Sequence, residues 1–114
     1  MTDGIDTLNE GEAAQGDQGQ VLLAAGERVS MRLWRDEEPT SDFVRSTRPY
    51  ETVGYVLQGV AELELDGATT RLEQGDSWVV PAGAEHGYRI VERLTAIEAT
   101  SPASHDNAPA PEGY

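Results

Sequence analysis

His86 is the side chain of this sequence best suited to chemistry, because an imidazole can ligate a metal, accept a proton or hydrogen-bond a ligand near neutral pH. It follows the segment Gly75-Asp76-Ser77-Trp78-Val79-Val80-Pro81-Ala82-Gly83. Gly75 and Gly83 permit backbone conformations that residues with a side chain avoid. Pro81 ends a strand because it has no N–H for the hydrogen-bond ladder. Together these residues predict a tight turn that holds His86 at the mouth of a small barrel.

Other catalytic patterns are missing from the sequence. The 114 residues contain no Cys, which excludes disulfides, thiolate metal sites and a cysteine nucleophile. The segment Ser104-His105-Asp106 contains the residue types of a catalytic triad, but three consecutive residues in an irregular tail cannot adopt its geometry. No glycine-rich phosphate loop or dinucleotide fingerprint is present.

The charge of the chain argues against several classes of partner. The net charge is -13, and all 8 basic residues are Arg. Because such a surface repels phosphates and anionic lipids, we expect no nucleic-acid or membrane binding. The sequence has no apolar run long enough to cross a bilayer and no signal-peptide pattern, which predicts a cytoplasmic protein. The acid excess suits a halophilic cytoplasm or reflects a simple solubility bias, and the sequence leaves both open.

Short strand-like segments separated by turns fill the centre of the chain. Apolar and polar residues alternate in several of them, as in half-buried strands, and Asp66-Gly67 predicts a type I′ hairpin turn. Gln58-Gly59 predicts a bend or bulge. The expected strands lie at residues 29–33, 53–57, 61–65, 77–80, 87–91 and 94–99. This spacing predicts an all-β fold, a small antiparallel barrel or sandwich.

Composition divides the chain into three parts. Residues 1–19 are polar and acidic and predict a flexible N-terminal arm, because they have too little apolar surface to offset the entropy of ordering. Residues 20–100 form the predicted barrel. Residues 101–114 are rich in Pro and small polar residues and predict a disordered tail. Alternatively, either end exchanges onto a neighbouring subunit.

Residues 75–86 resemble the second cupin motif, Gly, five residues, Pro-x-Gly, two residues, His. Residues 55–59, Tyr-Val-Leu-Gln-Gly, resemble the end of the first cupin motif. The resemblance covers roughly residues 28–99. It implies a jelly-roll barrel, the double-stranded β-helix of RmlC-like proteins. Because cupins include dioxygenases, isomerases, decarboxylases, storage proteins and sensors, it specifies no activity.

The first motif departs from the metal-binding pattern of the family. Counting back from the final Gly of the motif, Ser46 and Arg48 stand at the two His positions and Thr52 at the Glu position. Only His86 remains of the four usual ligands. A neutral hydroxyl is a weak ligand and a guanidinium cannot ligate, so we expect no metal and no other cofactor. Glu51 lies one position from the expected Glu, and a bulge that turned it inward would give the alternative, a metal held by Glu51 and His86.

Arg48 is the most informative departure, because the resemblance places its charge where other cupins hold their metal. A buried guanidinium needs an acceptor, ideally a carboxylate. We favour an internal salt bridge to Glu51 or Glu85 over an anionic ligand. If Arg48 instead binds an anionic ligand, Tyr50 is one of the aromatic residues expected to form the walls of the pocket. Because side chains alternate along a strand, about half of the candidate wall residues should face outward. The predicted binding residues are Ser46, Arg48, Glu51, Thr52, Tyr55, Trp78, His86 and Tyr88.

The sequence therefore predicts a metal-free, single-domain cupin-like protein that binds a small molecule, with carboxylates as one candidate class, or has a regulatory role without catalysis. The resemblance also implies a homodimer that buries outward apolar residues such as Val29, Leu33 or Trp34. The alternative is an enzyme: a metal-dependent oxygenase or isomerase, or a metal-independent isomerase or epimerase with His86 as base. A sensory module is a third class, but the sequence contains no helix-turn-helix segment.

Overall fold

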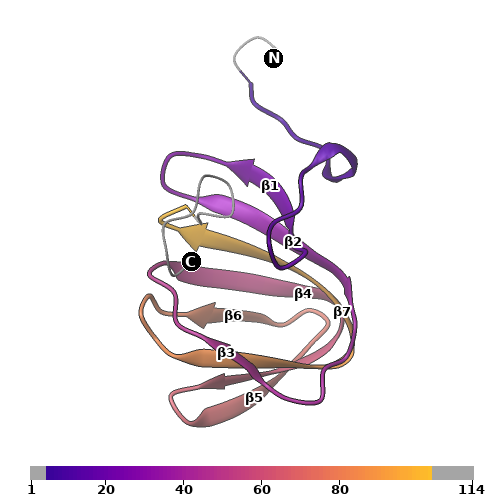
Figure 1. Cartoon of the computed structure of the whole chain (residues 1–114), viewed down its shortest axis with the longest axis vertical. Coiled ribbons are helices and arrows are strands. Elements are labelled where there is room, and N and C mark those ends of the chain that lie inside the picture. The colour runs from indigo at the N-terminus through magenta and orange to yellow at the C-terminus, as the bar shows by residue number, and fades with distance from the viewer. Residues whose placement is uncertain (1–4, 104–114) are drawn as a thin grey trace.

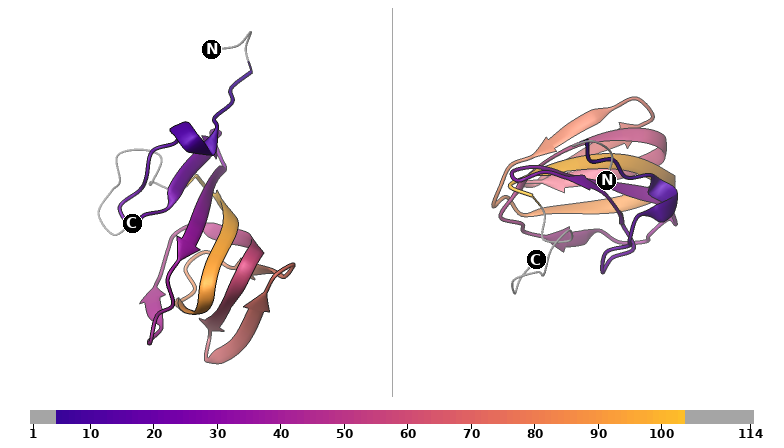
Figure 2. Two further views of the ribbon diagram at one scale, coloured as in Figure 1. Left: turned by 90° about the vertical axis from the view of Figure 1, so that its right-hand side faces the viewer. Right: turned by 90° about the horizontal axis from the view of Figure 1, so that it is seen from above.

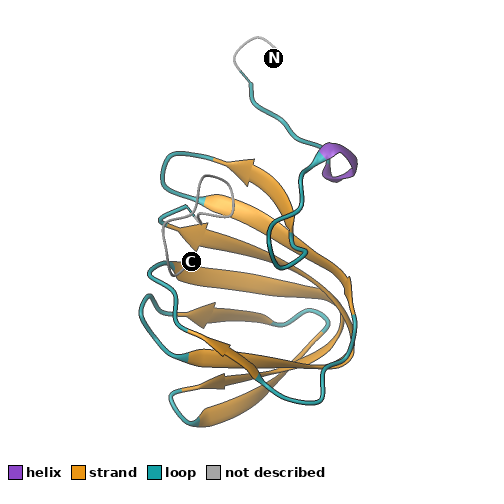
Figure 3. Cartoon of the chain, in the orientation of Figure 1, coloured by secondary structure: helices purple, strands orange, loops and turns teal. Residues whose placement is uncertain are grey.

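Strands carry nearly all the regular structure of residues 5–103, the part of the chain that this computed structural model describes (Figure 3). A short 3-10 helix, η1, precedes them at Glu10–Glu12. The predicted all-β class is confirmed. The strands are β1 (Val21–Ala25), β2 (Ser30–Glu37), β3 (Val44–Ser46), β4 (Glu51–Leu65), β5 (Ala68–Glu73), β6 (Ser77–Val80) and β7 (His86–Ser101).

The two long strands β4 and β7 form the central pair of the fold. They pair antiparallel along their whole length, from Glu51 opposite Ser101 to Leu65 opposite His86. The first half of β4 also pairs with β6 and its second half with β5. In the same way, the first half of β7 pairs with β3 and its second half with β2, to which β1 adds an edge. The sheet curls back on itself, so that its two halves face each other (Figures 1 and 2).

The bend of the two long strands depends on Gly59. Its φ is 95°, a conformation that L-residues with a side chain rarely adopt, and a Cβ here would collide with the carbonyl oxygen of Arg93 on β7. The β4–β7 register shifts on both sides of this position, between Val56 and Ala61. The predicted bulge is therefore confirmed. It joins two expected strands into one, since the chain passes from one half of the sheet to the other without a break in β4.

Local sequence also determined the β4–β5 hairpin. Asp66 and Gly67 have φ values of 50° and 82°, and they connect the paired residues Leu65 and Ala68. Positive φ at both positions is what a type I′ turn requires, so the predicted turn is confirmed. The strands β1, β3 and β5 were not predicted. Each is short or exposed, and Leu72 is the only buried residue of β5, so none shows a clear alternation.

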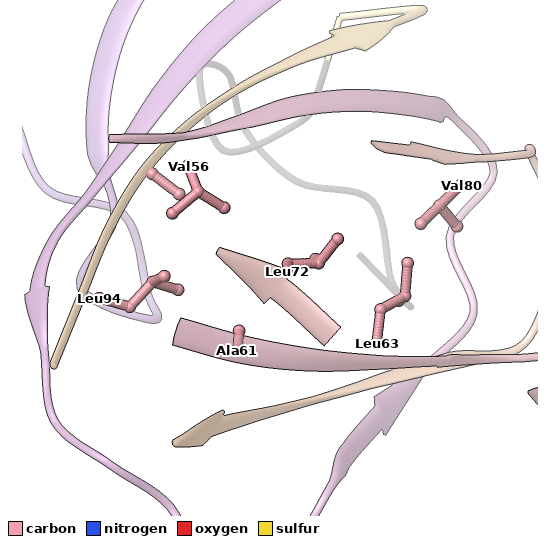
Figure 4. Close-up of a cluster of buried hydrophobic side chains, with 7 residues drawn as sticks. Val56, Ala61, Leu63, Leu72, Val80 and Leu94 are labelled. Carbon is pink, nitrogen blue, oxygen red and sulfur yellow. The ribbon is translucent and has the colours of Figure 1, made fainter. Parts of the chain in front are cut away.

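Apolar side chains from both halves of the sheet meet inside the barrel. One half of the sheet contributes Val56, Val80, Leu94 and Ala96, and the other half contributes the remaining residues of the cluster. All of these are buried, and six of them are labelled in Figure 4. The complete cluster is Val56, Ala61, Leu63, Leu72, Val80, Leu94 and Ala96. Because several of these residues are small, they do not fill the interior.

The N-terminal segment makes contacts with the barrel before residue 20, where the sequence places the domain boundary. Gln15 forms a β-bridge with Val21, and the N–H of Gly16 donates to the carbonyl of Gln20 at 2.8 Å. Composition does not report such backbone contacts, because the exposed edge of β1 accepts an extended segment of any polarity. The predicted tail starts at Ser101, which is the last residue of β7, and most of it, including Ser104-His105-Asp106, lies outside the described part of the chain.

Within residues 5–103, no helix has the length and apolar character needed to span a bilayer.

Replacing Gly59 with Ala tests the bend. Because the new Cβ meets the Arg93 carbonyl in a strained backbone conformation, we expect Gly59→Ala to lower the free energy of unfolding by more than about 3 kcal/mol. Gly67→Ala is the matched control, since Gly67 also has positive φ but open space around it, and should cost only about 1–2 kcal/mol. Denaturant unfolding measures both. Equal losses in the two variants would show that β7 does not constrain the bend.

Candidate functional site

A cavity of about 470 Å³ lies inside the barrel, beside the apolar cluster. This volume is in the range of small-molecule pockets. Its lining comes from distant parts of the sequence, including the Gln18 segment before β1, the loop before β4, and strands of both halves of the sheet. Six of the eight predicted binding residues line it: Ser46, Arg48, Thr52, Trp78, His86 and Tyr88.

The other two predicted binding residues, Glu51 and Tyr55, lie on the outer face of β4. Side chains alternate along a strand, and buried Thr52 and Val56 take the inward positions, so both neighbours face outward. Tyr55 is 45% exposed. The predictions that Glu51 joins the site and that it holds a metal with His86 are therefore wrong.

The predicted salt bridge of Arg48 to Glu51 or Glu85 stays a prediction. Both of these carboxylates belong to exposed residues. Arg48 itself is half-buried and lines the cavity, with its backbone carbonyl accepting from the N–H of Gly83 at 2.8 Å. This hydrogen bond ties the segment before β4 to the Pro-x-Gly turn.

His86 has one ring nitrogen fixed by the backbone and the other directed to Ser46. Nδ1 lies 3.0 Å from the carbonyl oxygen of Ala84, and because a carbonyl only accepts, Nδ1 carries the proton of the neutral ring. Nε2 is then an acceptor, 3.5 Å from the hydroxyl oxygen of Ser46, which lies directly opposite on β3. The imidazole is 9% exposed, and the ring of Tyr88 contacts it edge-on. His86 thus presents a lone pair inside the barrel.

A hydrogen-bonded Nδ1 with an available Nε2 is the arrangement of many metal-ligating histidines. The remaining family positions do not complete such a site, because Ser46, Arg48 and Thr52 supply two neutral hydroxyls and a cation. Within the described residues, no three His, Cys, Asp or Glu side chains come together as a group able to hold a metal. The residues present do not fit the transition metal that the family pattern implies.

An ion pair that sequence reasoning missed lies in the same cavity. Arg32 and Glu98 are directly opposite on β2 and β7, and Arg32 Nε donates to Glu98 Oε1 at 2.7 Å. Trp34 Nε1 donates to the same oxygen at 2.8 Å, and Arg32 Nη1 donates to the hydroxyl of Tyr50 at 3.2 Å. The guanidinium also lies 5.5 Å and 5.4 Å from the ring centroids of Trp34 and Tyr50. Trp34 therefore faces the cavity, and its predicted outward position is wrong.

Both members of this pair are buried, with side-chain exposures of 11% for Arg32 and 5% for Glu98. Burial alone lowers the pKa of Arg32, but the charge of Glu98 and the Tyr50 hydroxyl outweigh it and raise that pKa. Arg32 is therefore a permanent cation whose counter-ion is Glu98. The charges compensate each other, which gives the centre of the cavity a fixed polar group without a metal.

The two halves of the barrel are joined across the cavity by Trp78 and Tyr88. Trp78 Nε1 donates to the Tyr88 hydroxyl at 2.9 Å, and Gly54, opposite Trp78 on β4, leaves room for the indole. A side chain at position 54 would collide with the Trp78 ring. Burial first, and then the charge of Glu98, raise the pKa of Tyr88. The phenol therefore stays protonated and its O–H remains a donor.

Comparison with known proteins agrees with this architecture. The cupin domain family matches residues 33–98, more than half of the chain, and the protein belongs to that family. The match runs from β2 to Glu98, so it includes the Arg48 region, His86 and most of the cavity lining.

Individual relatives show the fold rather than an activity. A crystal structure of an RmlC-like cupin from Shewanella frigidimarina is similar over 95% of this chain and 100% of its own, with a TM-score of 0.78 and 20% identity. The structure of KdgF from Halomonas sp. is similar over 91% and 98%, with a TM-score of 0.69 and 24% identity. A protein of Aquifex aeolicus, named only as uncharacterized, is 39% identical over 51 residues, and that match spans 42% of its length.

The Arg32–Glu98 pair yields a thermodynamic prediction. Because Arg32→Met leaves a buried carboxylate without its counter-ion, we expect it to cost about 3–5 kcal/mol of unfolding free energy. The double variant with Glu98→Leu should be more stable than Arg32→Met alone, since no uncompensated charge remains. Arg93→Met, which breaks the exposed pair with Glu38, is the control and should cost about 1 kcal/mol or less. Urea unfolding of the four proteins measures these differences, and additive losses in the double variant would contradict the coupling.

Proposed function

We propose that this cupin binds a small anionic molecule, of the carboxylate class, in the barrel cavity without a metal. The observation that carries the proposal is the 470 Å³ cavity, whose lining combines Arg48, His86 and Ser46 with aromatic walls from Trp34 and Trp78. Arg is the side chain whose geometry best matches a carboxylate. A mostly apolar pocket with a few convergent polar groups is the usual form of a small-molecule site.

Arg48 is the basis for the anionic class. Its side chain lines the cavity beside Ser46 and His86, the other polar groups of the site. Arg32, the buried cation of the cavity, is paired with Glu98 at 2.7 Å. A carboxylate beside Arg48 gains a charge-assisted hydrogen bond in a site shielded from water, where that interaction is stronger than in bulk solvent.

A thermal-shift series tests the proposal. We expect small carboxylates at millimolar concentration to raise the melting temperature of the wild type by several degrees, because binding to the folded state alone stabilises it. Arg48→Ala should abolish the shift, whereas Arg35→Ala, which removes an exposed Arg paired with Glu10, should retain it. Equal shifts in the wild type and Arg48→Ala would contradict the anionic site. Elemental analysis of the same protein, purified without a chelating tag, should give less than stoichiometric metal.

A metal-independent isomerase or epimerase is the second candidate function. The observation that favours it is the position of His86 Nε2 inside the cavity, where its hydrogen bond from the Ser46 hydroxyl is long, at 3.5 Å, so that a bound substrate can replace Ser46 and use Nε2 as a base. The metal-dependent oxygenase or isomerase loses its second ligand, because Glu51 faces outward.

We also propose that two copies of the chain associate through the outer face of β2, β7, β4 and β6. Met31, Ala99, Val53 and Val79 are paired in one row across these strands, and the large ones among them are exposed. Tyr55 lies in the next row. Chains with a net charge of -13 repel each other least where this apolar row meets its copy, which favours a second copy over a charged partner. Of the sequence-predicted contacts, Leu33 is already buried in the monomer, while Val29 is exposed beside this face.

A charge placed in the middle of this face tests the association. Val53→Glu should convert a dimer into a monomer of 12.3 kDa, because two like charges would face each other across the two-fold axis. Thr69→Glu, on an exposed position of β5, is the control and should remain dimeric. Light scattering coupled to size exclusion gives the masses, and a monomeric wild type at micromolar concentration would overturn the proposal.

A further inference from the structure

Glu98 has a carboxylate oxygen that the protein itself does not use. Both of its hydrogen bonds, from Arg32 Nε and Trp34 Nε1, go to Oε1. Among the described residues, no donor reaches Oε2, although Glu98 is only 5% exposed and lines the cavity. A carboxylate accepts at both oxygens, and a buried oxygen without a donor is costly. The second oxygen is therefore an acceptor directed to whatever occupies the cavity.

Two hydroxyl groups of the same cavity also have hydrogen-bonding capacity that no described residue uses. The side chain of Thr52 is 5% exposed, and its hydroxyl has no hydrogen bond to any described residue. The hydroxyl of Tyr88 accepts from Trp78 Nε1, and its own proton has no acceptor in residues 5–103. Thr52 can both donate and accept, whereas Tyr88 has a proton to donate.

Strand register gathers these three groups in one part of the barrel. Arg32, Glu98, Gly54 and Trp78 are paired in one row across β2, β7, β4 and β6. Thr52 lies two residues before Gly54 on the same inward face, which places it diagonally from Glu98, at about 7–8 Å between Cα atoms. Tyr88 reaches the row from the opposite half of the sheet through Trp78.

We propose that Glu98 Oε2, the Thr52 hydroxyl and the Tyr88 hydroxyl form a subsite for the hydroxyl groups of the ligand. This inference rests on the proposed function: Arg48 takes the carboxylate, and this subsite takes the hydroxylated remainder of the same molecule. The ligand class is then a small hydroxylated carboxylate. Glu98 accepts from one ligand hydroxyl, while Tyr88 and Thr52 donate to the oxygens of others.

The charge of the row favours a hydroxyl over an ammonium group. Glu98 already neutralises Arg32, so a ligand cation would add an uncompensated charge to a buried site. A hydroxyl supplies the same hydrogen-bond donor without that cost. The indole and phenol rings of Trp34, Trp78 and Tyr50 add apolar surface for the carbon chain of such a ligand.

Three six-carbon probes separate the subsite from the carboxylate site: gluconate carries both hydroxyls and a carboxylate, hexanoate only the carboxylate, and sorbitol only hydroxyls. Isothermal titration of the wild type, Thr52→Val, Tyr88→Phe and Arg48→Ala measures each affinity. Thr69→Val is the matched control on the exposed side of β5. We expect gluconate to bind the wild type at least about tenfold more tightly than hexanoate, because the deoxygenated probe leaves three polar groups without partners.

The variants show which residues cause the preference for gluconate over hexanoate. Thr52→Val and Tyr88→Phe should each weaken gluconate binding about five- to tenfold and leave hexanoate binding unchanged. Arg48→Ala should weaken gluconate and hexanoate alike. Thr69→Val should behave as the wild type with all three probes.

Thr52→Val also shows whether weaker binding results from a less stable fold. Valine has nearly the shape of threonine, and it removes a buried hydroxyl that has no partner in the free protein, so the melting temperature should stay equal or rise. A gain in stability with a loss of gluconate affinity is the signature of a binding group. Tyr88→Phe should instead melt at a lower temperature, because it deprives Trp78 Nε1 of its acceptor.

The remaining outcomes distinguish the two proposals. Equal affinity of the wild type for gluconate and hexanoate, both dependent on Arg48, would overturn the hydroxyl subsite and keep the carboxylate site. Sorbitol binding that depends on Thr52 and Tyr88, without any binding of hexanoate, would keep the subsite and overturn the carboxylate class. Binding of none of the probes would overturn both.

Discussion

The continuous pairing of β4 with β7 is the constraint on which the rest of the structure depends. The two strands stay hydrogen-bonded from Glu51 and Ser101 at one end to Leu65 and His86 at the other, and they change sheet halves together. Because every other strand except β1 adds to one of these two, the bend at Gly59 sets how the two inner faces oppose each other. The barrel therefore closes around a space that neither half could enclose alone.

The interior of that space has a polar centre made by an ion pair. Where the family pattern implies a metal held by imidazole and carboxylate ligands, this chain has Ser46, Arg48 and Thr52, with a single His86 beside them. The fixed charges of the cavity lie further inside, on Arg32 and Glu98, and their mutual compensation makes the site neutral as a pair. This pair presents hydrogen-bonding groups to the cavity in fixed directions, because Arg32, Trp34 and Tyr50 hold it in place.

Under the proposed function, stability and ligand binding compete at this centre. A protein optimised only for folding would replace Thr52 by an apolar residue and fill the cavity beside Leu72 and Val56. The chain instead keeps a buried hydroxyl and a carboxylate oxygen without partners among the described residues. Retained polar groups of this kind are typical of sites that are completed by a ligand.

The sequence by itself determined the local features. Alternation gave the strand class, Asp66-Gly67 gave a turn with two positive φ values, and the Pro81–Gly83 turn positioned His86. The family pattern showed which metal ligands are absent. These features depend on neighbouring residues, so a linear pattern contains them.

Only the tertiary structure decided which faces look inward and which charges meet. The period of a strand is two, so alternation alone leaves open whether Thr52 or Glu51 faces inward, and a bulge of one residue would exchange them. Arg32 and Glu98 are 66 residues apart, and they are partners only because β2 and β7 pair in one register. The long-range register of the strands, set by the bend of β4 and β7, therefore determined which side chains line the cavity.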